Sequence, residues 1–241
     1  MTIDLRRFDV VDSTNAECRR IADGGYGGNI WIVSGEQSAG RGRRGREWVS
    51  RPGNFFASLL YAIDCDLRTA SQLSFVAALA VRDVVADILQ SNDSIKCKWP
   101  NDILVGGKKI SGILLETTGL GGETPSHVII GIGINVSHYP HNPQYPATSL
   151  KDEGYTVEPE LVMDRLARSM AHWISRWKDH GFSLIRQAWK DNARGLGQDI
   201  IVRLPDEELR GRFVDLDDNG ALILEFDGER RHITAGDVFF A

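Results

Sequence analysis

Residues 30–48 read IWIVSGEQSAGRGRRGREW, an apolar segment that runs into a loop rich in glycine and arginine. The continuous apolar run at its start is typical of a buried strand. The loop then alternates small and cationic residues: Gly40, Arg41, Gly42, Arg43, Arg44, Gly45 and Arg46. Glycine permits positive φ and close approach of a ligand, and guanidinium groups match carboxylates and phosphates. The segment predicts a strand that ends in an anion-binding loop.

Three other interpretations of this loop are open. Gly40-x-Gly42-x-x-Gly45 matches the dinucleotide-binding fingerprint, but Arg51-Pro52-Gly53 follows where that fold would open a helix. A solvated basic loop and a nucleic-acid patch are the ordinary alternatives. The glycine density, and Trp31 and Trp48 as expected walls of a pocket, favour anion binding.

Composition limits the function further. The 241 residues include 28 basic and 33 acidic side chains, so the net charge is −5 and any cationic function must be local. Three widely spaced cysteines indicate no disulfide framework. The first residues lack the apolar run of a signal peptide, and no stretch has the length and apolarity of a membrane span. A cytoplasmic location is expected.

Hydrophobic periodicity predicts helices and strands together, an α+β fold. Helices are expected at 14–22, 71–90 and 161–177, the first with Thr14 and Glu17 at the spacing of a capping box. Strands are expected at 30–33, 54–63, 96–105, 109–116 and 127–136. Pro100 interrupts the strand at 96–105, and Gly106-Gly107 makes a turn after it.

The composition changes near residues 192–198. Beyond this point Asn219-Gly220 and Asp227-Gly228 lie between apolar runs, which is a strong hairpin signal. We therefore expect a large catalytic domain at 1–192 and a small β-barrel domain at 193–241.

Lys98-Trp99-Pro100-Asn101-Asp102 is a second candidate for function. Because proline cannot donate to a sheet ladder, Asn101 and Asp102 are expected to project from a strand end, where binding groups commonly lie. An ordinary turn stabilised by these side chains is the alternative.

Lys108 and Lys109 begin an apolar strand that continues through Gly112. Alternation turns one lysine inward, where it needs an anionic partner, and Gly112 permits close approach of a ligand. A lysine that protects an edge strand is the equally weighted alternative.

The segment 131–135, Gly-Ile-Gly-Ile-Asn, is interpreted either as tight sheet packing or as a flat floor for a ring system with Asn135 at its end. Ser13-Thr14-Asn15 is either a helix cap or part of a site. The histidines show no metal-ligand spacing, so no protein metal site is predicted.

Taken together and in order, these motifs resemble the catalytic domain of biotin protein ligases. The matching segments are 12–15, 36–46, Trp48, 98–102, 109–114, 131–135 and 146–150. The resemblance covers roughly residues 8–190. It implies a mixed central sheet with flanking helices, the fold of class II synthetases and biotin–lipoate ligases, followed by a small SH3-like β-barrel.

The resemblance also implies an activity. The family joins biotin to ATP as biotinyl-5'-AMP, releases pyrophosphate, and passes biotin to a lysine of a biotin carboxyl carrier domain. Mg²⁺ is expected with ATP. About ten residues precede the Ser-Thr-Asn motif, too few for the DNA-binding domain of family members that are also repressors. No DNA or membrane partner is expected, and a homodimer is left open.

Site residues follow from the matching positions. The resemblance implies catalytic roles for Lys109, beside the biotin carboxylate and the α-phosphate, and for Arg43, which closes the loop over the intermediate. Biotin contacts are expected from Ser13, Thr14, Asn15, Gln37, Gly40, Arg41, Gly42, Arg43, Lys109, Gly112 and Gly131. Contacts to ATP or the adenylate are expected from Arg43, Trp48, Asn101, Asp102, Lys109 and Asn135. Arg44 and Arg46 receive no role and are expected to be solvated.

Two rival functions are weighed. A lipoate–protein ligase shares the fold and the acyl-adenylate chemistry, but the polar set of Ser13, Thr14 and Gln37 favours a ureido ring. A regulator that binds biotin or nucleic acid without catalysis is the other, and an intact Lys109 and Asp102 count against it.

Overall fold

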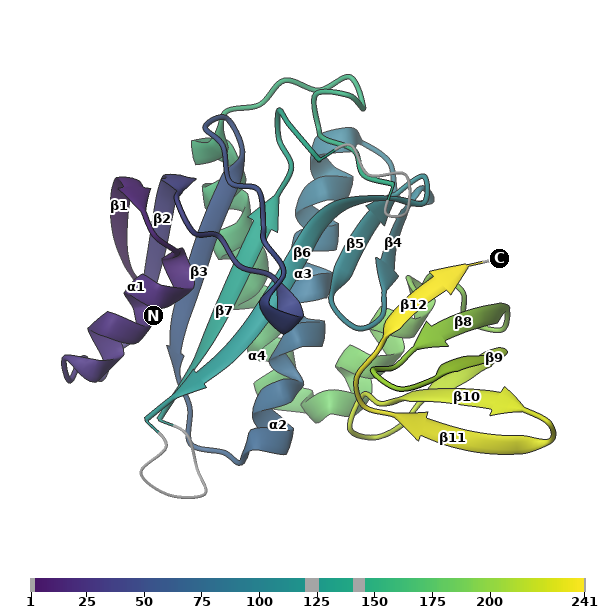
Figure 1. The fold of residues 1–241 in the computed structure, drawn as a ribbon. Helices are drawn as coiled ribbons and strands as arrows, with labels where there is room; N and C mark the ends of the chain where they lie inside the picture. The colour runs from purple at the N-terminus through teal and green to yellow at the C-terminus, as the bar shows by residue number, and fades with distance from the viewer. Residues whose placement is uncertain (1–2, 120–125, 141–145, 241) are drawn as a thin grey trace.

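The computed structural model describes residues 3–119, 126–140 and 146–240, which form two sheets with helices around the larger one (Figure 1). The larger sheet has the order β1-β2-β3-β7-β6-β5-β4. Its strands are β1 (Asp4–Val11), β2 (Ile30–Gln37), β3 (Phe55–Ala62), β4 (Ile95–Lys98), β5 (Asp102–Val105), β6 (Lys108–Thr118) and β7 (His127–Ile134). β1 and β2 are parallel and the other neighbours antiparallel, so the sheet is mixed, as predicted.

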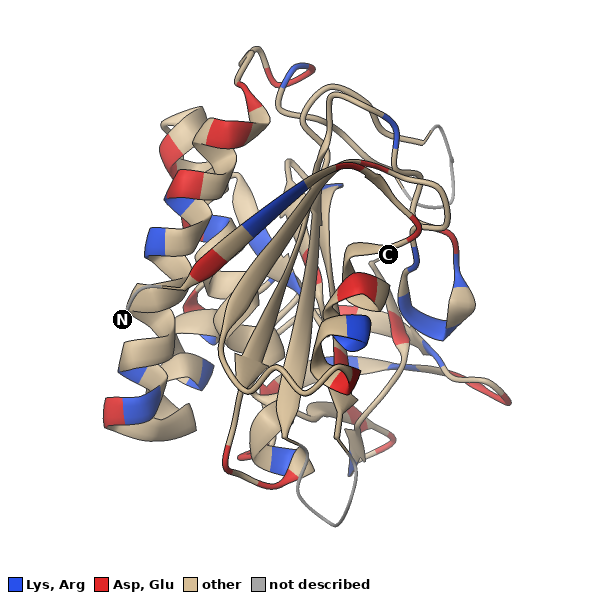
Figure 2. Ribbon diagram, turned by 90° about the vertical axis from the view of Figure 1, so that its left-hand side faces the viewer, with Lys and Arg blue, Asp and Glu red and all other residues tan. Residues whose placement is uncertain are grey.

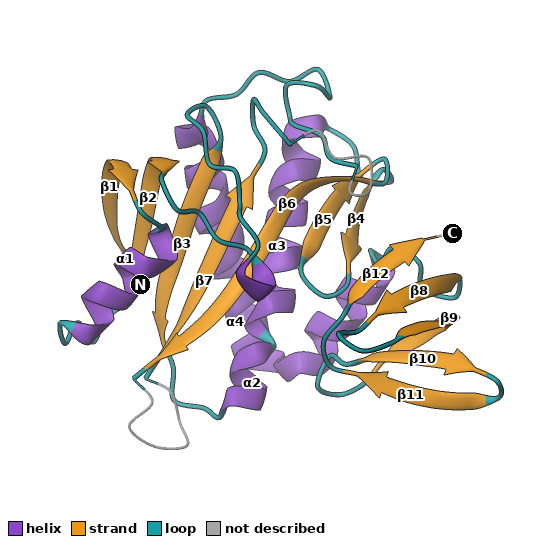
Figure 3. Cartoon of the chain, in the orientation of Figure 1, coloured by secondary structure: helices purple, strands orange, loops and turns teal. Residues whose placement is uncertain are grey.

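The helices occupy both faces of this sheet (Figure 3). They are α1 (Thr14–Asp23), α2 (Leu67–Ser71), α3 (Leu73–Leu89) and α4 (Pro159–Asp191), with a short 3-10 turn η1 (Arg43–Gly45) in the arginine-rich loop. α3 and α4 pack together on one face, and α1 and the loop lie on the other. Figure 2 shows the same separation from the side.

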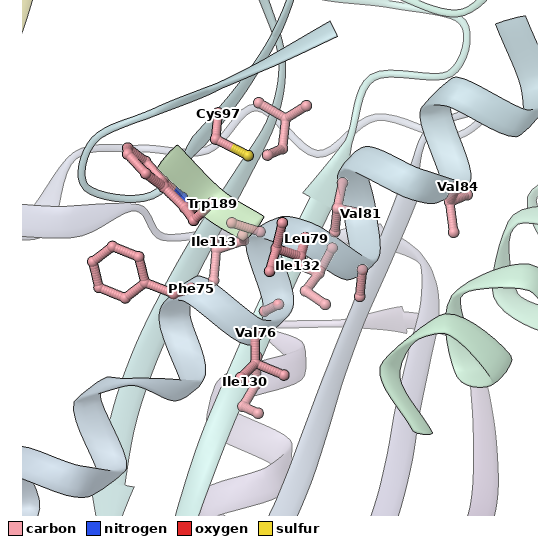
Figure 4. Close-up of a cluster of buried hydrophobic side chains, with 14 of the residues drawn as sticks. Phe75, Val76, Leu79, Val81, Val84, Cys97, Ile113, Ile130, Ile132 and Trp189 are labelled. Atoms are coloured by element: carbon pink, nitrogen blue, oxygen red, sulfur yellow. The ribbon is translucent and has the colours of Figure 1, made fainter. Parts of the chain in front are cut away.

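The main core lies between the sheet and α3. Phe75 packs edge-on against Trp189 with ring centroids 5.5 Å apart, and α3 is buried on nearly all sides because α4 covers its outer surface. Ile113, Ile130 and Ile132 point into this core (Figure 4). Because side chains alternate along a strand, the residues between them face the opposite side, where α1 and the loop lie.

The structure corrects the prediction for residues 96–105. They form two antiparallel strands, β4 and β5, in which Lys98 pairs with Asp102 across a turn that contains the cis Trp99–Pro100 bond. Pro100 cannot donate to a ladder, so the chain turns at it instead of resuming the same strand.

Two further elements differ from the expectations. β1 was not predicted, because its sequence DLRRFDVV carries charge at the edge of the sheet and shows no apolar alternation. The helix expected at 161–177 continues as α4 to Asp191, through a break in helical geometry at Gly181 with φ +70°.

The C-terminal residues form a five-stranded antiparallel sheet with the order β11-β10-β9-β8-β12. Its strands are β8 (Asp199–Arg203), β9 (Glu208–Leu216), β10 (Leu222–Phe226), β11 (Glu229–Ile233) and β12 (Asp237–Phe240). Gly220 and Gly228 both take positive φ at the predicted hairpin turns. The domain boundary at 192/193 stays a prediction.

Candidate functional site

A cavity of about 650 Å³ opens on the sheet face that carries α1 and the arginine-rich loop. Its floor is the glycine-bearing side of β6 and β7, its roof is the loop, and β12 of the smaller sheet borders one end. The volume is that of a site for a small molecule or cofactor. The site runs across the sheet from β7 to β4, so different strands supply its two ends.

One end is a network of neutral polar side chains. The backbone N–H and the hydroxyl of Thr14 lie 2.8 and 3.1 Å from Gln37 Oε1, and Gln37 Nε2 donates to Ser50 Oγ at 2.8 Å. The structure therefore corrects the capping-box prediction: Ser13 is the N-cap of α1, and the Thr14 hydroxyl turns toward Gln37.

Asn15 continues this network over the floor. Its Oδ1 accepts from Ser58 Oγ at 2.6 Å, and its Nδ2 donates to Glu116 Oε2 at 2.8 Å. A Cβ at Gly131 would lie 2.2 Å from Asn15 Oδ1, so only glycine fits beneath this side chain. Glu116 also lies 3.4 Å from Arg41 Nη2, which ties the loop to β6.

Trp48 covers the middle of the floor. Its indole lies over Gly133 and Gly112, where an added Cβ would approach ring atoms to 2.5 and 3.0 Å. The indole Nε1 is buried and makes no hydrogen bond within the described residues. Residues 131–135 were interpreted as a possible floor for a ring system. In the structure the ring that lies on them is the indole of Trp48. Trp31, the other expected pocket wall, is instead in the core and 2% exposed.

The other end is cationic. Lys109 Nζ lies 2.6 Å from Asp102 Oδ1 and 5.2 Å from the centroid of the Trp48 ring. The ammonium of Lys109 has three N–H donors, so the ion pair with Asp102 leaves others to reach an anion in the cavity. Lys108 points outward to Glu153, so one lysine faces inward as predicted. β6 is an interior strand, which excludes the edge-protection interpretation.

Arg43 faces the same end from the roof. Its Nη1 donates to Asn101 Oδ1 at 3.1 Å, and Asn101 Nδ2 donates in turn to the carbonyl of Ile113 at 2.6 Å. Burial lowers the pKa of Arg43, against the attraction of Asp237 and Asp102. A partly desolvated guanidinium gains much from an entering anion, because that anion replaces the lost hydration.

Arg44 and Arg46 are not simply solvated, which corrects the expectation. Both pair with Asp237 at the start of β12, Arg44 at 3.4 Å and Arg46 more closely. The pKa of Asp237 is lowered, because its hydrogen bond to Arg46 and the nearby arginine charges outweigh the effect of burial. The smaller sheet thus holds the loop by its outer arginines while Arg43 faces inward.

Replacing Asp237 with asparagine is expected to loosen this loop. Both ion pairs are lost while the shape is kept, and the arginines then repel one another. We expect trypsin to cleave after Arg44 or Arg46 several times faster than in the wild type, with an unchanged melting temperature. Arg230 and Glu225 form an exposed pair on the far hairpin, so Glu225→Gln is the matched control. Equal cleavage rates in all three proteins would contradict the assignment.

Gly40 lies outside the cavity lining. A Cβ there would meet Ser50 Oγ at 2.3 Å and the carbonyl of Trp48 at 2.5 Å, so it packs the base of the loop. Of the three loop glycines only Gly45 has positive φ, at +71°.

Asn135 lines the cavity, and its Nδ2 donates to the carbonyl of Thr148 at 3.0 Å.

All the other predicted site residues meet around this one cavity: Ser13, Thr14, Asn15, Gln37, Arg41, Gly42, Arg43, Trp48, Asn101, Asp102, Lys109, Gly112, Gly131 and Asn135. Sequence reasoning missed Glu116, Lys98 and Asp237. Lys98 belonged to a motif already singled out, whereas Asp237 and Glu116 carry no local signal because distant contacts bring them to the site.

Comparison with known proteins identifies the family. Residues 8–135 match the Biotin/lipoate A/B protein ligase family, and residues 195–241 match the biotin protein ligase C-terminal domain. A biotin–[acetyl-CoA-carboxylase] ligase of Paracoccus denitrificans is 42% identical over 95% of this chain and 97% of its own length. The chain belongs to the biotin protein ligase family. It is therefore an enzyme of the ligase class.

Two further biotin protein ligases show how far the likeness extends. The bifunctional ligase/repressor BirA of Bacillus subtilis is 33% identical, over 95% of this chain and 72% of its own. The structure of the biotin protein ligase from Aquifex aeolicus in complex with biotin and ATP superposes with a TM-score of 0.82 at 25% identity. The superposition covers 98% of this chain and 97% of the Aquifex aeolicus chain, so the likeness includes both sheets.

The helices of the described residues are too short or too polar to cross a membrane. The same part of the chain contains no cluster of three or more histidine, cysteine or acidic side chains suited to a metal ion.

Proposed function

We propose that this enzyme activates biotin with ATP as biotinyl-5'-AMP and transfers the biotinyl group to a lysine of a biotin carboxyl carrier domain. One observation carries the proposal. A single cavity has a neutral polar end around Asn15 and Gln37 and a cationic end around Lys109 and Arg43. Biotin has the same two ends, a ureido ring and a carboxylate.

The polar end suits the ureido ring. That ring offers one carbonyl and two N–H groups in an apolar bicycle, which needs a few placed donors and acceptors on rigid walls. Thr14, Gln37 and Asn15 supply both kinds of group, and Glu116 fixes the amide of Asn15. Ser13, Arg41, Gly42, Gly112 and Gly131 border the same space.

The cationic end suits the first chemical step. A biotin carboxylate must attack the α-phosphate of a polyanion, and fixed positive donors lower the repulsion between them and orient the attack. Lys109 and Arg43 face this space from the floor and the roof. Asn101 positions Arg43, Asp102 positions Lys109, and Trp48 and Asn135 border the adenylate.

Mg²⁺ would be bound by the nucleotide more than by the protein. Of the acidic residues in the cavity lining, Asp102 and Asp237 are paired with cations, and Glu47 is exposed. This donor set fits an ion that keeps several waters and takes phosphate oxygens as ligands. When bound, the ion would neutralise phosphate charge. The cytoplasmic location stays a prediction, and whether the enzyme forms a homodimer stays open.

The floor glycines give a test of ligand placement. In a Gly131→Ala variant the new methyl group displaces Asn15, and with it the contact to Glu116. We expect the KM for biotin to rise at least tenfold and the KM for ATP to change less than threefold, because ATP lies at the other end. Gly27→Ala, in the loop between α1 and β2 and outside the cavity lining, is the control for an alanine, because no atom lies within 4 Å of the added carbon. Equal changes in both KM values would contradict the placement.

The deciding experiment is biotin transfer. The enzyme is incubated with biotin, MgATP and a biotin carrier domain, and the acceptor is probed for covalent biotin. A parallel exchange of pyrophosphate into ATP, with biotin or with lipoate, distinguishes the two ligase functions. Exchange with lipoate alone would favour the rival, and the absence of both activities would overturn the proposal.

A further inference from the structure

Lys98 is a cation in the cavity that the proposed mechanism does not use. It is the last residue of β4, lies opposite Asp102 in the ladder and lines the cavity. Asp102 contacts Lys109. Among the residues that the structure describes, no carboxylate and no hydrogen-bond acceptor contacts the Lys98 ammonium.

The surroundings of Lys98 disfavour its charged form when no anion is bound nearby. Its Nζ lies 5.7 and 5.9 Å from the ring centroids of Phe239 and Phe240 on β12. The side chain is half-buried, and burial lowers its pKa despite the nearby Asp102. Aromatic faces stabilise a cation only partly compared with water. An anion that enters the cavity would restore the lost stabilisation.

The place of Lys98 across the sheet indicates which anion this is. Asn15 lies over β7, Lys109 is on β6, Asp102 is on β5 and Lys98 is on β4. In phosphoryl and nucleotidyl transfer the attacking and leaving oxygens lie roughly in line on opposite sides of the phosphorus. If biotin occupies the β7 side and its carboxylate meets the α-phosphate near Lys109, the leaving group points toward β4.

We propose that Lys98, between β4 and the rings of β12, binds the β- and γ-phosphates of ATP and holds the departing pyrophosphate. In this step a biotin carboxylate oxygen bonds to the α-phosphorus. The bond from that phosphorus to the bridging oxygen breaks, and its electron pair stays on pyrophosphate. The Lys98 ammonium stabilises this negative charge and no proton is transferred. The inference rests on the proposed function and adds a separate role for the β4 end of the site.

The test uses the reverse reaction, in which pyrophosphate and biotinyl-5'-AMP form ATP. In Lys98→Met, whose apolar chain suits the Phe239 and Phe240 rings, we expect the KM for pyrophosphate to rise roughly tenfold to a hundredfold, the loss expected for one charge-assisted contact. Lys98→Arg is expected to restore it to within about threefold of the wild type. Lys96→Met, two residues earlier in β4 and outside the cavity lining, is the charge-matched control.

A second readout excludes general damage to the site. Transfer of biotin from supplied biotinyl-5'-AMP to the carrier domain involves no pyrophosphate, so Lys98→Met should retain the wild-type rate. An unchanged KM for pyrophosphate, or an equal loss of transfer from supplied adenylate, would overturn the role of Lys98. If the wild type itself forms no ATP from biotinyl-5'-AMP and pyrophosphate, the proposed function fails instead.

Discussion

Replacing Lys109 with methionine is expected to lower biotin-dependent pyrophosphate release by roughly a hundredfold to a thousandfold, the usual loss when one preorganised donor to a developing charge is removed. The ammonium is held on the floor by its ion pair with Asp102 and lies beneath Trp48. Methionine retains much of the side-chain volume but donates nothing. Release is measured by a coupled phosphate assay at saturating biotin and MgATP.

The neighbouring lysine supplies the control for this substitution. Lys108 is on the same strand but points outward to Glu153, so Lys108→Met removes an equal charge from the protein surface. We expect its rate to stay within twofold of the wild type. A near-normal rate in Lys109→Met would remove Lys109 from the chemistry, and an equal loss in both variants would indicate a change in net charge or folding.

Arg43→Gly is expected to keep forming the adenylate but to release it into solution. Arg43 closes the roof through its contact with Asn101, and glycine removes both this contact and the charge that faces the intermediate. Lys109 stays in place, so the first step continues. We expect at least ten times more free biotinyl-5'-AMP in the filtrate after rapid ultrafiltration than for the wild type, in the absence of a carrier domain.

Two comparisons make this result specific. Arg51→Gly makes the same change at an exposed position outside the cavity lining, and should retain the intermediate. In Arg43→Gly, pyrophosphate release should continue past one equivalent per enzyme, because each lost adenylate frees the site. If the variant retained the adenylate as the wild type does, Arg43 would not be a gate.

Sequence patterns predicted the helices, strands and hairpins whose formation depends mainly on neighbouring residues. The period of α3, the apolar runs of β2, β3, β6 and β7, and the hairpins at Gly220 and Gly228 are visible in the sequence because each depends on neighbouring residues. β1 was missed because it pairs by one edge and carries charged residues there. Pro100 was recognised as an interruption, but the reversal of the chain there was not predicted.

The predicted site residues were found through a resemblance of ordered motifs, and the structure brings nearly all of them to one cavity. Asp237 and Glu116 could not be found in this way. Asp237 lies 191 residues from Arg46 along the chain, and Glu116 lies 101 residues from Asn15. No short pattern encodes such contacts, because folding of both sheets creates them.

The glycine floor also limits how the binding site can be redesigned. Gly131 and Gly133 already have the smallest side chain available, and Ile130 and Ile132 on the reverse of the same strand fill the core. Room for a biotin analogue with a bulky substituent therefore cannot be made from below. It has to come from trimming Asn15 or Trp48, the residues that lie above these glycines. A library that varies those two positions, and leaves β7 unchanged, would enlarge the cavity without disturbing the packing behind it.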